Sequence, residues 1–189
     1  MNSVEMGLQL LGPEECDILK LLYPRFSNEE IQNRRSKLLA EMEKQKIDAL
    51  LVAEFLFTGS AAHWITNWPA TTATIVLLVP DQPVHIIVEH YNHLPHAQKM
   101  VTDAEVIWGK RIPLEVAQQT IKKLKQSVHR LGVIGRLSPD EQETIAVGVE
   151  EIVDFNSTYR KIRLVKSEEE LHWIRIGALF SDMALDAMV

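Results

Sequence analysis

The sequence contains a single cysteine, Cys16, and this scarcity is its first constraint. One thiol cannot form an internal disulfide bond, and it cannot supply a cysteine-based zinc site. Such sparing use of cysteine is typical of a reducing compartment, so we expect a cytoplasmic protein. The first residues also lack a basic segment followed by an apolar one, and we therefore recognise no secretory signal peptide.

Three other absences reduce the number of functions that this sequence could have. The longest apolar run surrounds residues 75–79 and is far shorter than the roughly 20 residues that cross a bilayer. The net charge is −6 and basic residues form no cluster, which argues against nucleic acid and membrane surfaces as partners. The sequence contains no P-loop, no Gly-x-Gly-x-x-Gly and no Gly-x-Ser-x-Gly, so phosphate-binding loops and a serine nucleophile elbow are not indicated.

The residues that are present predict an α/β domain. Apolar runs typical of strands occur at residues 47–53, 72–79, 84–89, 104–108, 131–135 and 151–154. Segments with helical periodicity separate most of them, at residues 28–46, 114–128 and from residue 138, with a shorter one after Pro13. The turn at residues 81–83 makes a hairpin, so we predict three layers: a mixed, mostly buried sheet flanked by helices.

The last predicted helix has a clear start and no stop. Three serines are each followed three residues later by glutamate, a capping-box pattern, at Ser27, Ser138 and Ser167. The apolar stripe that follows the last box comprises Leu171, Ile174, Ala178, Leu185 and Met188. No Gly, Asn or Pro ends this helix. We therefore expect a truncated C-terminal helix, and a chain that is the N-terminal part of a longer protein.

One region is rich in possible metal ligands. It contains His85, Glu89, His90, His93 and His96. Histidine and carboxylate groups bind zinc and related ions when at least three of them converge. Pro95 interrupts a continuous helix that would align the last three histidines. A small metal-binding protein and a merely polar junction between strand and helix both remain open.

Residues 59–69 form the second candidate site. His63, Trp64 and Trp68 lie close together in the sequence and could line a ligand pocket. The alternative is a strand edge whose aromatic rings pack on the sheet.

Three segments, taken in order, resemble the N-terminal domain of the creatinase/prolidase family of pita-bread metallopeptidases, which includes Xaa-Pro aminopeptidases and Xaa-Pro dipeptidases. Residues 34–52 resemble the family's arginine-bearing helix and its Asp-Ala-Leu-Leu-Val strand. Residues 63–68 resemble its aromatic-Leu-Thr-Gly-aromatic signature, with Asn67 in place of glycine. Both residue types tolerate a left-handed backbone, so we expect the turn to be kept. Residues 164–175 resemble the junction with the catalytic domain.

The resemblance implies where the domains of the chain begin and end and which domain carries catalysis. Residues 1–27 are an extension, residues 28–160 the N-terminal domain, and residues 161–189 a linker with the first helix of a catalytic domain. In this family catalysis belongs to that later domain, where two divalent ions (Mn, Co or Zn) are held by two aspartates, a histidine and two glutamates. We therefore assign no catalytic residue, no metal ligand and no cofactor to this chain, and expect it to be inactive alone.

The resemblance also implies a role for the domain itself. Such domains resemble a lid and dimer-forming module, here in a homodimer, and in some members they reach toward the partner subunit's active site, which makes His63 and Trp64 the substrate-side candidates. The intact protein would act on a small peptide or small amide; Xaa-Pro peptides, creatine and other amides remain open. The alternative is a peptide- or protein-binding module from a catalytically inactive relative.

Overall fold

The computed structural model describes residues 9–55 and 60–188. The chain forms two compact units. The first combines Met1–Glu30 with Arg163–Val189, and the second is Ile31–Ile162. No helix in the described ranges is both long and apolar enough to cross a membrane.

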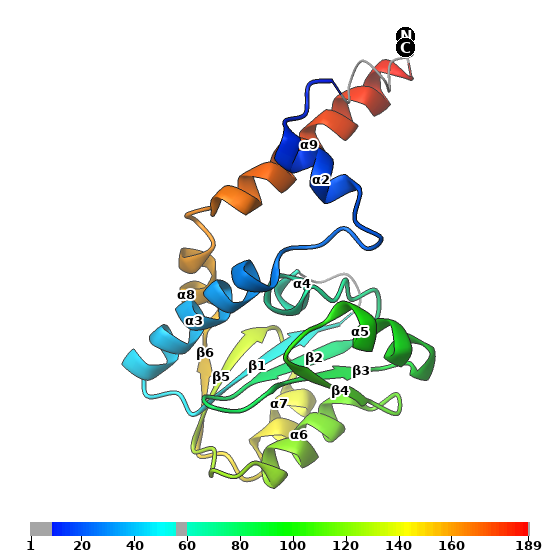
Figure 1. The fold of residues 1–189 in the computed structure, drawn as a ribbon. Helices are drawn as coiled ribbons and strands as arrows, with labels where there is room; N and C mark the ends of the chain where they lie inside the picture. The colour runs from blue at the N-terminus through cyan, green and yellow to red at the C-terminus, as the bar shows by residue number, and fades with distance from the viewer. Residues whose placement is uncertain (1–8, 56–59, 189) are drawn as a thin grey trace. The chain divides into compact units, whose positions relative to one another are not determined.

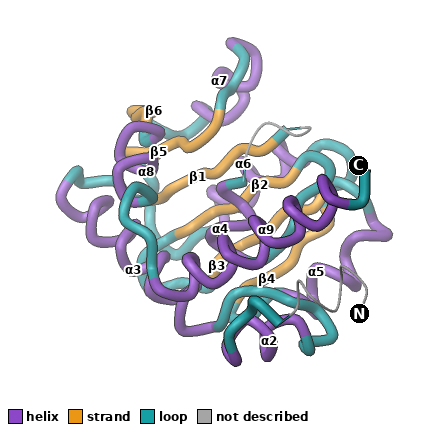
Figure 2. The backbone as a smooth tube through the Cα atoms, turned by 90° about the horizontal axis from the view of Figure 1, so that it is seen from above, coloured by secondary structure: helices purple, strands orange, loops and turns teal. Residues whose placement is uncertain are grey.

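The second unit is built on one six-stranded sheet with the order β4-β3-β2-β1-β5-β6 (Figure 2). The strands are β1 (Ala49–Glu54), β2 (Thr74–Leu78), β3 (Val84–Val88), β4 (Ala104–Trp108), β5 (Arg130–Gly135) and β6 (Glu151–Asp154). Strand β2 is antiparallel to both neighbours, and the other three pairs are parallel. The predicted mixed sheet is confirmed, and β1, β5 and β6 run in the same direction side by side.

Helices cover both faces of this sheet, as Figure 1 shows, which confirms the three-layer α/β prediction. One face carries α3 (Asn28–Lys44), α4 (Ala61–Thr66), α5 (Leu94–Met100) and α8 (Asn156–Ile162). The other carries α6 (Pro113–Lys123) and α7 (Pro139–Ala146). A short 3₁₀ turn, η1 (Tyr91–His93), precedes α5.

Strand β1 shows why its sequence does not alternate between apolar and polar residues. Leu50 and Val52 belong to the core under α3 and α4, whereas Leu51 and Ala53 belong to the core under α6 and α7. Successive strand residues point to opposite faces, so a strand covered on both sides is apolar at every position. All residues of β1 are buried.

One helical prediction is corrected by the structure, and one observed helix was not predicted. The stripe over residues 114–128 predicted one long helix, but α6 ends at Lys123 and Leu124 has an extended backbone. Leu124 still packs against the core and Val128 is buried in it, so burial alone accounts for the rest of the stripe. Helix α8 was not predicted, because seven residues are too few to show a helical period.

In the first unit, the N-terminal segment packs along the final helix. Helix α2 (Pro13–Leu19) contacts α9 (Glu168–Asp186). The buried carboxylate of Glu15 lies 2.7 Å from Nδ1 of His172 and 3.5 Å from Nη1 of Arg175. The rings of Phe26 and Trp173 lie 5.4 Å apart. The extension, which the sequence left without a role, therefore has a docking helix in its own unit.

The capping boxes show how these helices start. The boxes at Ser138 and Ser167 are confirmed in both of their hydrogen bonds. At Ser27 the hydroxyl accepts from the N–H of Glu30 at 3.1 Å, but the Ser27 N–H donates to Glu169 on α9. A carboxylate from another helix therefore replaces the local glutamate at this position.

The face of α9 that is buried differs from the predicted stripe. Ile176 is 3% exposed, whereas Ile174 and Leu185 of the stripe are 52% and 58% exposed. Most of the apolar stripe is therefore accessible to solvent in this chain.

Candidate functional site

Two consecutive arginines of α3 hold α4 in place. Nη1 of Arg34 donates to the Trp64 carbonyl at 3.1 Å, and Nε of Arg35 donates to the Ile65 carbonyl at 3.0 Å. The last carbonyls of a helix have no partner within it and carry partial negative charge, so buried cations stabilise them. Desolvation in this position lowers the pKa of Arg35. The arginine-bearing helix of the sequence signature is thus the support of α4.

The Trp64 side chain is buried against the helices that support α4. Its side chain is 6% exposed, and its ring meets the Tyr159 ring edge-on with centroids 5.6 Å apart. The Arg34 guanidinium lies over the indole, with Cζ 5.1 Å from the centroid. The structure therefore places Trp64 in the core between α3, α4 and α8.

His63 occupies a partly exposed position on the same helix. It is the one residue of α4 that is not buried. Desolvation, with a smaller effect from the Arg34 charge, lowers the pKa of His63. The imidazole is therefore neutral at pH 7 and can both donate and accept a hydrogen bond.

A left-handed turn ends α4. Asn67 has φ 65° and its N–H donates to the His63 carbonyl at 2.8 Å. The Thr66 hydroxyl accepts from the N–H of Trp68 at 3.1 Å. The expected turn with asparagine in the glycine position is confirmed. The strand-edge alternative for this segment is wrong, because residues 61–66 are helical; Gly59 lies outside the described residues.

The histidine-rich region does not assemble into a metal centre. His85 lies in β3 with its Nδ1 3.2 Å from Glu105 of β4. The rings of His90 and His93 are 5.6 Å apart, and Pro95 lies in the first turn of α5. Within residues 9–55 and 60–188, no three His, Cys, Asp or Glu side chains come close enough together to hold a metal ion. Of the two interpretations that the sequence left open, the region fits the polar junction between a strand and a helix.

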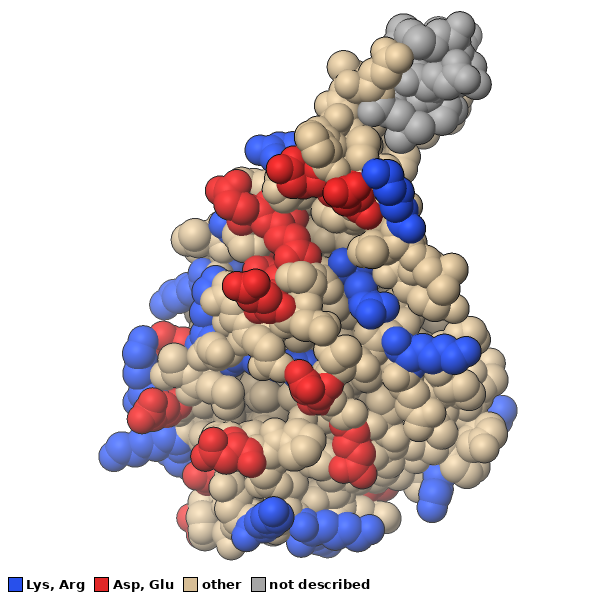
Figure 3. Space-filling model, in the orientation of Figure 1, with Lys and Arg blue, Asp and Glu red and all other residues tan. Residues whose placement is uncertain are grey.

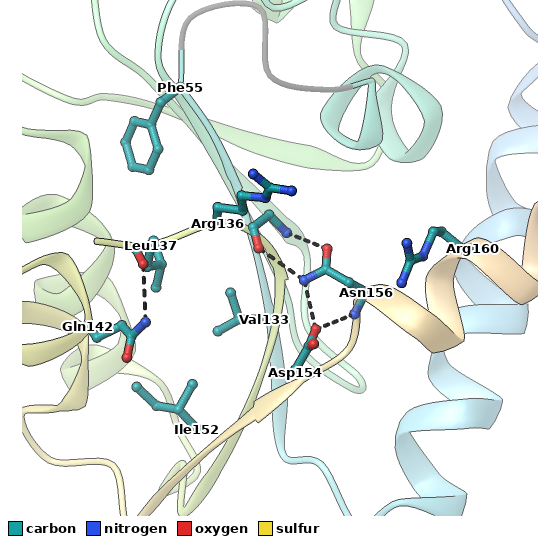
Figure 4. A pocket seen from close by; sticks show the side chains of 10 residues that line it. Phe55, Val133, Arg136, Leu137, Gln142, Ile152, Asp154, Asn156 and Arg160 are labelled. Carbon is teal, nitrogen blue, oxygen red and sulfur yellow. Dashed lines mark hydrogen bonds between the residues drawn. The ribbon is translucent and has the colours of Figure 1, made fainter. Parts of the chain in front are cut away.

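A hollow of about 1020 Å³ lies at the carboxyl ends of β1, β5 and β6 (Figure 4). Its apolar lining consists of Phe55, Val133, Leu137 and Ile152. Its polar lining consists of Arg136, Gln142, Asp154, Asn156 and Arg160. In α/β sheets, crevices at the carboxyl ends of strands are the usual place for ligands. The sequence analysis missed this site, although Arg136 directly follows one predicted strand and Asn156 lies two residues after the end of another.

Asn156 holds the floor of the hollow together. Its Oδ1 accepts from the N–H of Gly135 and its Nδ2 donates to the Gly135 carbonyl, both at 3.0 Å. Its own N–H and Nδ2 donate to Asp154 at 2.8 and 2.7 Å. These hydrogen bonds lower the pKa of the Asp154 carboxyl, which is therefore ionised at neutral pH. The end of β5, the end of β6 and the start of α8 form one hydrogen-bonded unit.

Comparison with known proteins identifies related folds. A model of the Creatinase/Prolidase N-terminal domain matches residues 34–165, more than half of the chain. The Xaa-Pro dipeptidase from Bacillus anthracis superposes with a TM-score of 0.62 at 17% identity, over 75% of this chain and 38% of its own. The X-Pro aminopeptidase from Thermotoga maritima gives 0.61 at 18%, over 72% and 37%. None of the curated proteins compared matches the chain.

A third structure is similar in extent as well as in fold. The N-terminal domain of a cytoplasmic peptidase from Mycobacterium tuberculosis superposes with a TM-score of 0.57 at 17% identity, over 69% of this chain and 98% of its own. The chain thus spans 38% of the dipeptidase and 37% of the aminopeptidase, but nearly all of an isolated N-terminal domain. Identities this low establish the fold alone.

Proposed function

Because the chain belongs to the creatinase/prolidase N-terminal domain family, we propose that it is the non-catalytic domain of a metal-dependent Xaa-Pro peptidase-like hydrolase. In that protein it serves dimerisation and substrate access. The two divalent ions (Mn, Co or Zn) that membership of this family implies are assigned to a catalytic domain, and we propose no metal ligand in this chain. Similarity to a cytoplasmic peptidase and the single cysteine support a cytoplasmic location.

The observation that carries the substrate-side proposal is the contrast between His63 and Trp64. Trp64 is buried and held by Arg34, whereas His63 is the one partly exposed residue of the same short helix. A side chain on a rigid support is suited to reach a neighbouring pocket with little loss of entropy. We assign His63 to contact with peptide in the partner subunit's pocket, and Trp64 to positioning it.

Dimerisation is tested on the chain itself by sedimentation equilibrium. We expect a reversible dimer with a dissociation constant in the micromolar range. A monomer at every concentration up to about 1 mM, which corresponds to a binding free energy weaker than about 4 kcal/mol, would contradict this role for the domain.

Substrate access is tested in the longer protein that carries this domain. We expect His63→Ala to lower kcat/KM for a Xaa-Pro dipeptide about tenfold, the size of one lost hydrogen bond to substrate. His129→Ala is the matched control, because His129 precedes β5 at the other end of the sheet. Equal activity of the two variants would refute the assignment. A protein that binds the dipeptide without cleaving it would instead support the inactive-relative alternative.

A further inference from the structure

The hollow at the carboxyl ends of β1, β5 and β6 has no part in the proposed function, and its chemistry indicates a ligand of its own. We propose that it binds a small monocarboxylate that carries an apolar group. The proposal rests on the lining of this hollow alone. It holds or fails independently of dimerisation and of the role of His63.

The charges of the lining select a single negative charge. Arg136 and Arg160 contribute two guanidinium groups, and Asp154 contributes one ionised carboxylate. The sum of +1 complements a monoanion, whereas a dianion would leave one negative charge uncompensated beside Asp154. Guanidinium groups bind carboxylates through paired, charge-assisted hydrogen bonds.

The positions of the two arginines fit this role. Figure 4 shows Asn156 between Arg136 and Arg160, with one arginine following β5 and the other on α8. Both side chains are exposed, so they keep their freedom to close on an anion. Lys, Arg, Asp and Glu side chains are interspersed on the face of the molecule seen in Figure 3.

The apolar part of the ligand has its own wall. In Figure 4, Phe55 and Ile152 lie at opposite ends of the view, and Val133 and Leu137 lie between them. A volume of about 1020 Å³ is at the upper end of what small-ligand sites provide. An apolar surface beside a cationic pair is the combination that binds an aryl or alkyl carboxylate.

The floor is organised before any ligand binds. Asn156 fixes the Gly135 backbone through two hydrogen bonds, and Gln142 fixes the Leu137 carbonyl through Nε2 at 3.1 Å. A prearranged floor reduces the entropy lost on binding. These amide groups also act as reporters, because a ligand in the hollow changes their surroundings.

The test is an NMR titration of the 189-residue chain with phenylacetate, phenylacetamide and inorganic phosphate. We expect phenylacetate to shift the Gly135 N–H and the Asn156 side-chain amide signals saturably. We expect binding of the neutral amide and of phosphate to be at least about tenfold weaker, since each lacks one of the two interactions. Equal affinity for phenylacetamide or for phosphate would overturn the proposal.

Variants make the test specific. Arg136→Gln and Arg160→Gln should each weaken phenylacetate binding about tenfold, and the double variant should abolish it. Arg111→Gln removes the same charge outside the hollow and should leave the affinity unchanged. Unchanged affinity in the two hollow variants, or an equal loss in Arg111→Gln, would refute the site. Because Arg136 and Arg160 are exposed, the amide spectrum should show that the fold is retained.

Discussion

Arg34 binds Trp64 in two ways at once: its Nη1 donates to the Trp64 carbonyl at 3.1 Å, and its Cζ lies 5.1 Å from the centre of the indole ring. The arginine is fully buried, and it joins the long helix α3 to the short helix α4. A six-residue helix has little stability of its own. The position of His63 therefore depends on a side chain 29 residues earlier in the sequence.

We predict that Arg34→Ala lowers the free energy of unfolding by about 2 to 4 kcal/mol, because a buried carbonyl loses its donor and the indole loses its cation. Lys37→Ala, at an exposed position of the same helix, should change it by less than about 0.5 kcal/mol. Urea unfolding measures both variants. Similar values for the two would show that Arg34 does not hold α4.

The lowered pKa of His63 predicts a pH effect on stability. Below its ordinary value of about 6.5, the unfolded chain takes up a proton that the folded chain resists. The contribution of neutral His63 to the unfolding free energy is therefore fully present above pH 6.5. It is lost as the pH falls through the pKa of His63 in the folded chain. We expect the unfolding free energy of the native chain, minus that of His63→Gln, to decrease from pH 8 to pH 5. A difference that stays constant or increases would contradict this.

Glu15 should hold the N-terminal helix on α9. The hydrogen bond with His172 is the main cause of its lowered pKa, so the contact is present above about pH 4.5 and is lost as the carboxylate is protonated. We predict that Glu15→Gln raises hydrogen exchange of the α2 amides several-fold at pH 7, because the charge is removed while the size is kept. Glu14→Gln, at an exposed neighbour, is the control and should have no effect.

Two glycines with positive φ allow a matched comparison. Gly135 has φ 112°, and an added Cβ would collide with the backbone oxygen of Ala53. Gly148 has φ 89°, and an added Cβ there would meet no atom within 4 Å. We predict that Gly148→Ala costs about 1 kcal/mol from backbone strain alone, and that Gly135→Ala costs about 4 kcal/mol or more. Equal costs in urea unfolding would show that the β1–β5 contact relaxes freely.

Some of the candidate site could be predicted from sequence and some could not. The left-handed turn at Asn67 was predictable, because few residue types tolerate that backbone. The helical state of residues 61–66 was not, because its support comes from Arg34 and Arg35 on another helix. The hollow required knowing that β1, β5 and β6 are parallel neighbours, which no local pattern reveals.

The sequence by itself determined the local features: where strands occur, where capped helices start at Ser138 and Ser167, and the α/β class. These depend on hydrogen bonds and periodicities within a few residues. Tertiary structure decided which strands are neighbours, which face of α9 is buried, and that His63 is accessible while Trp64 is not. The reason is physical: these outcomes depend on contacts between segments far apart in the chain, and burial and strand pairing exist only once those segments meet.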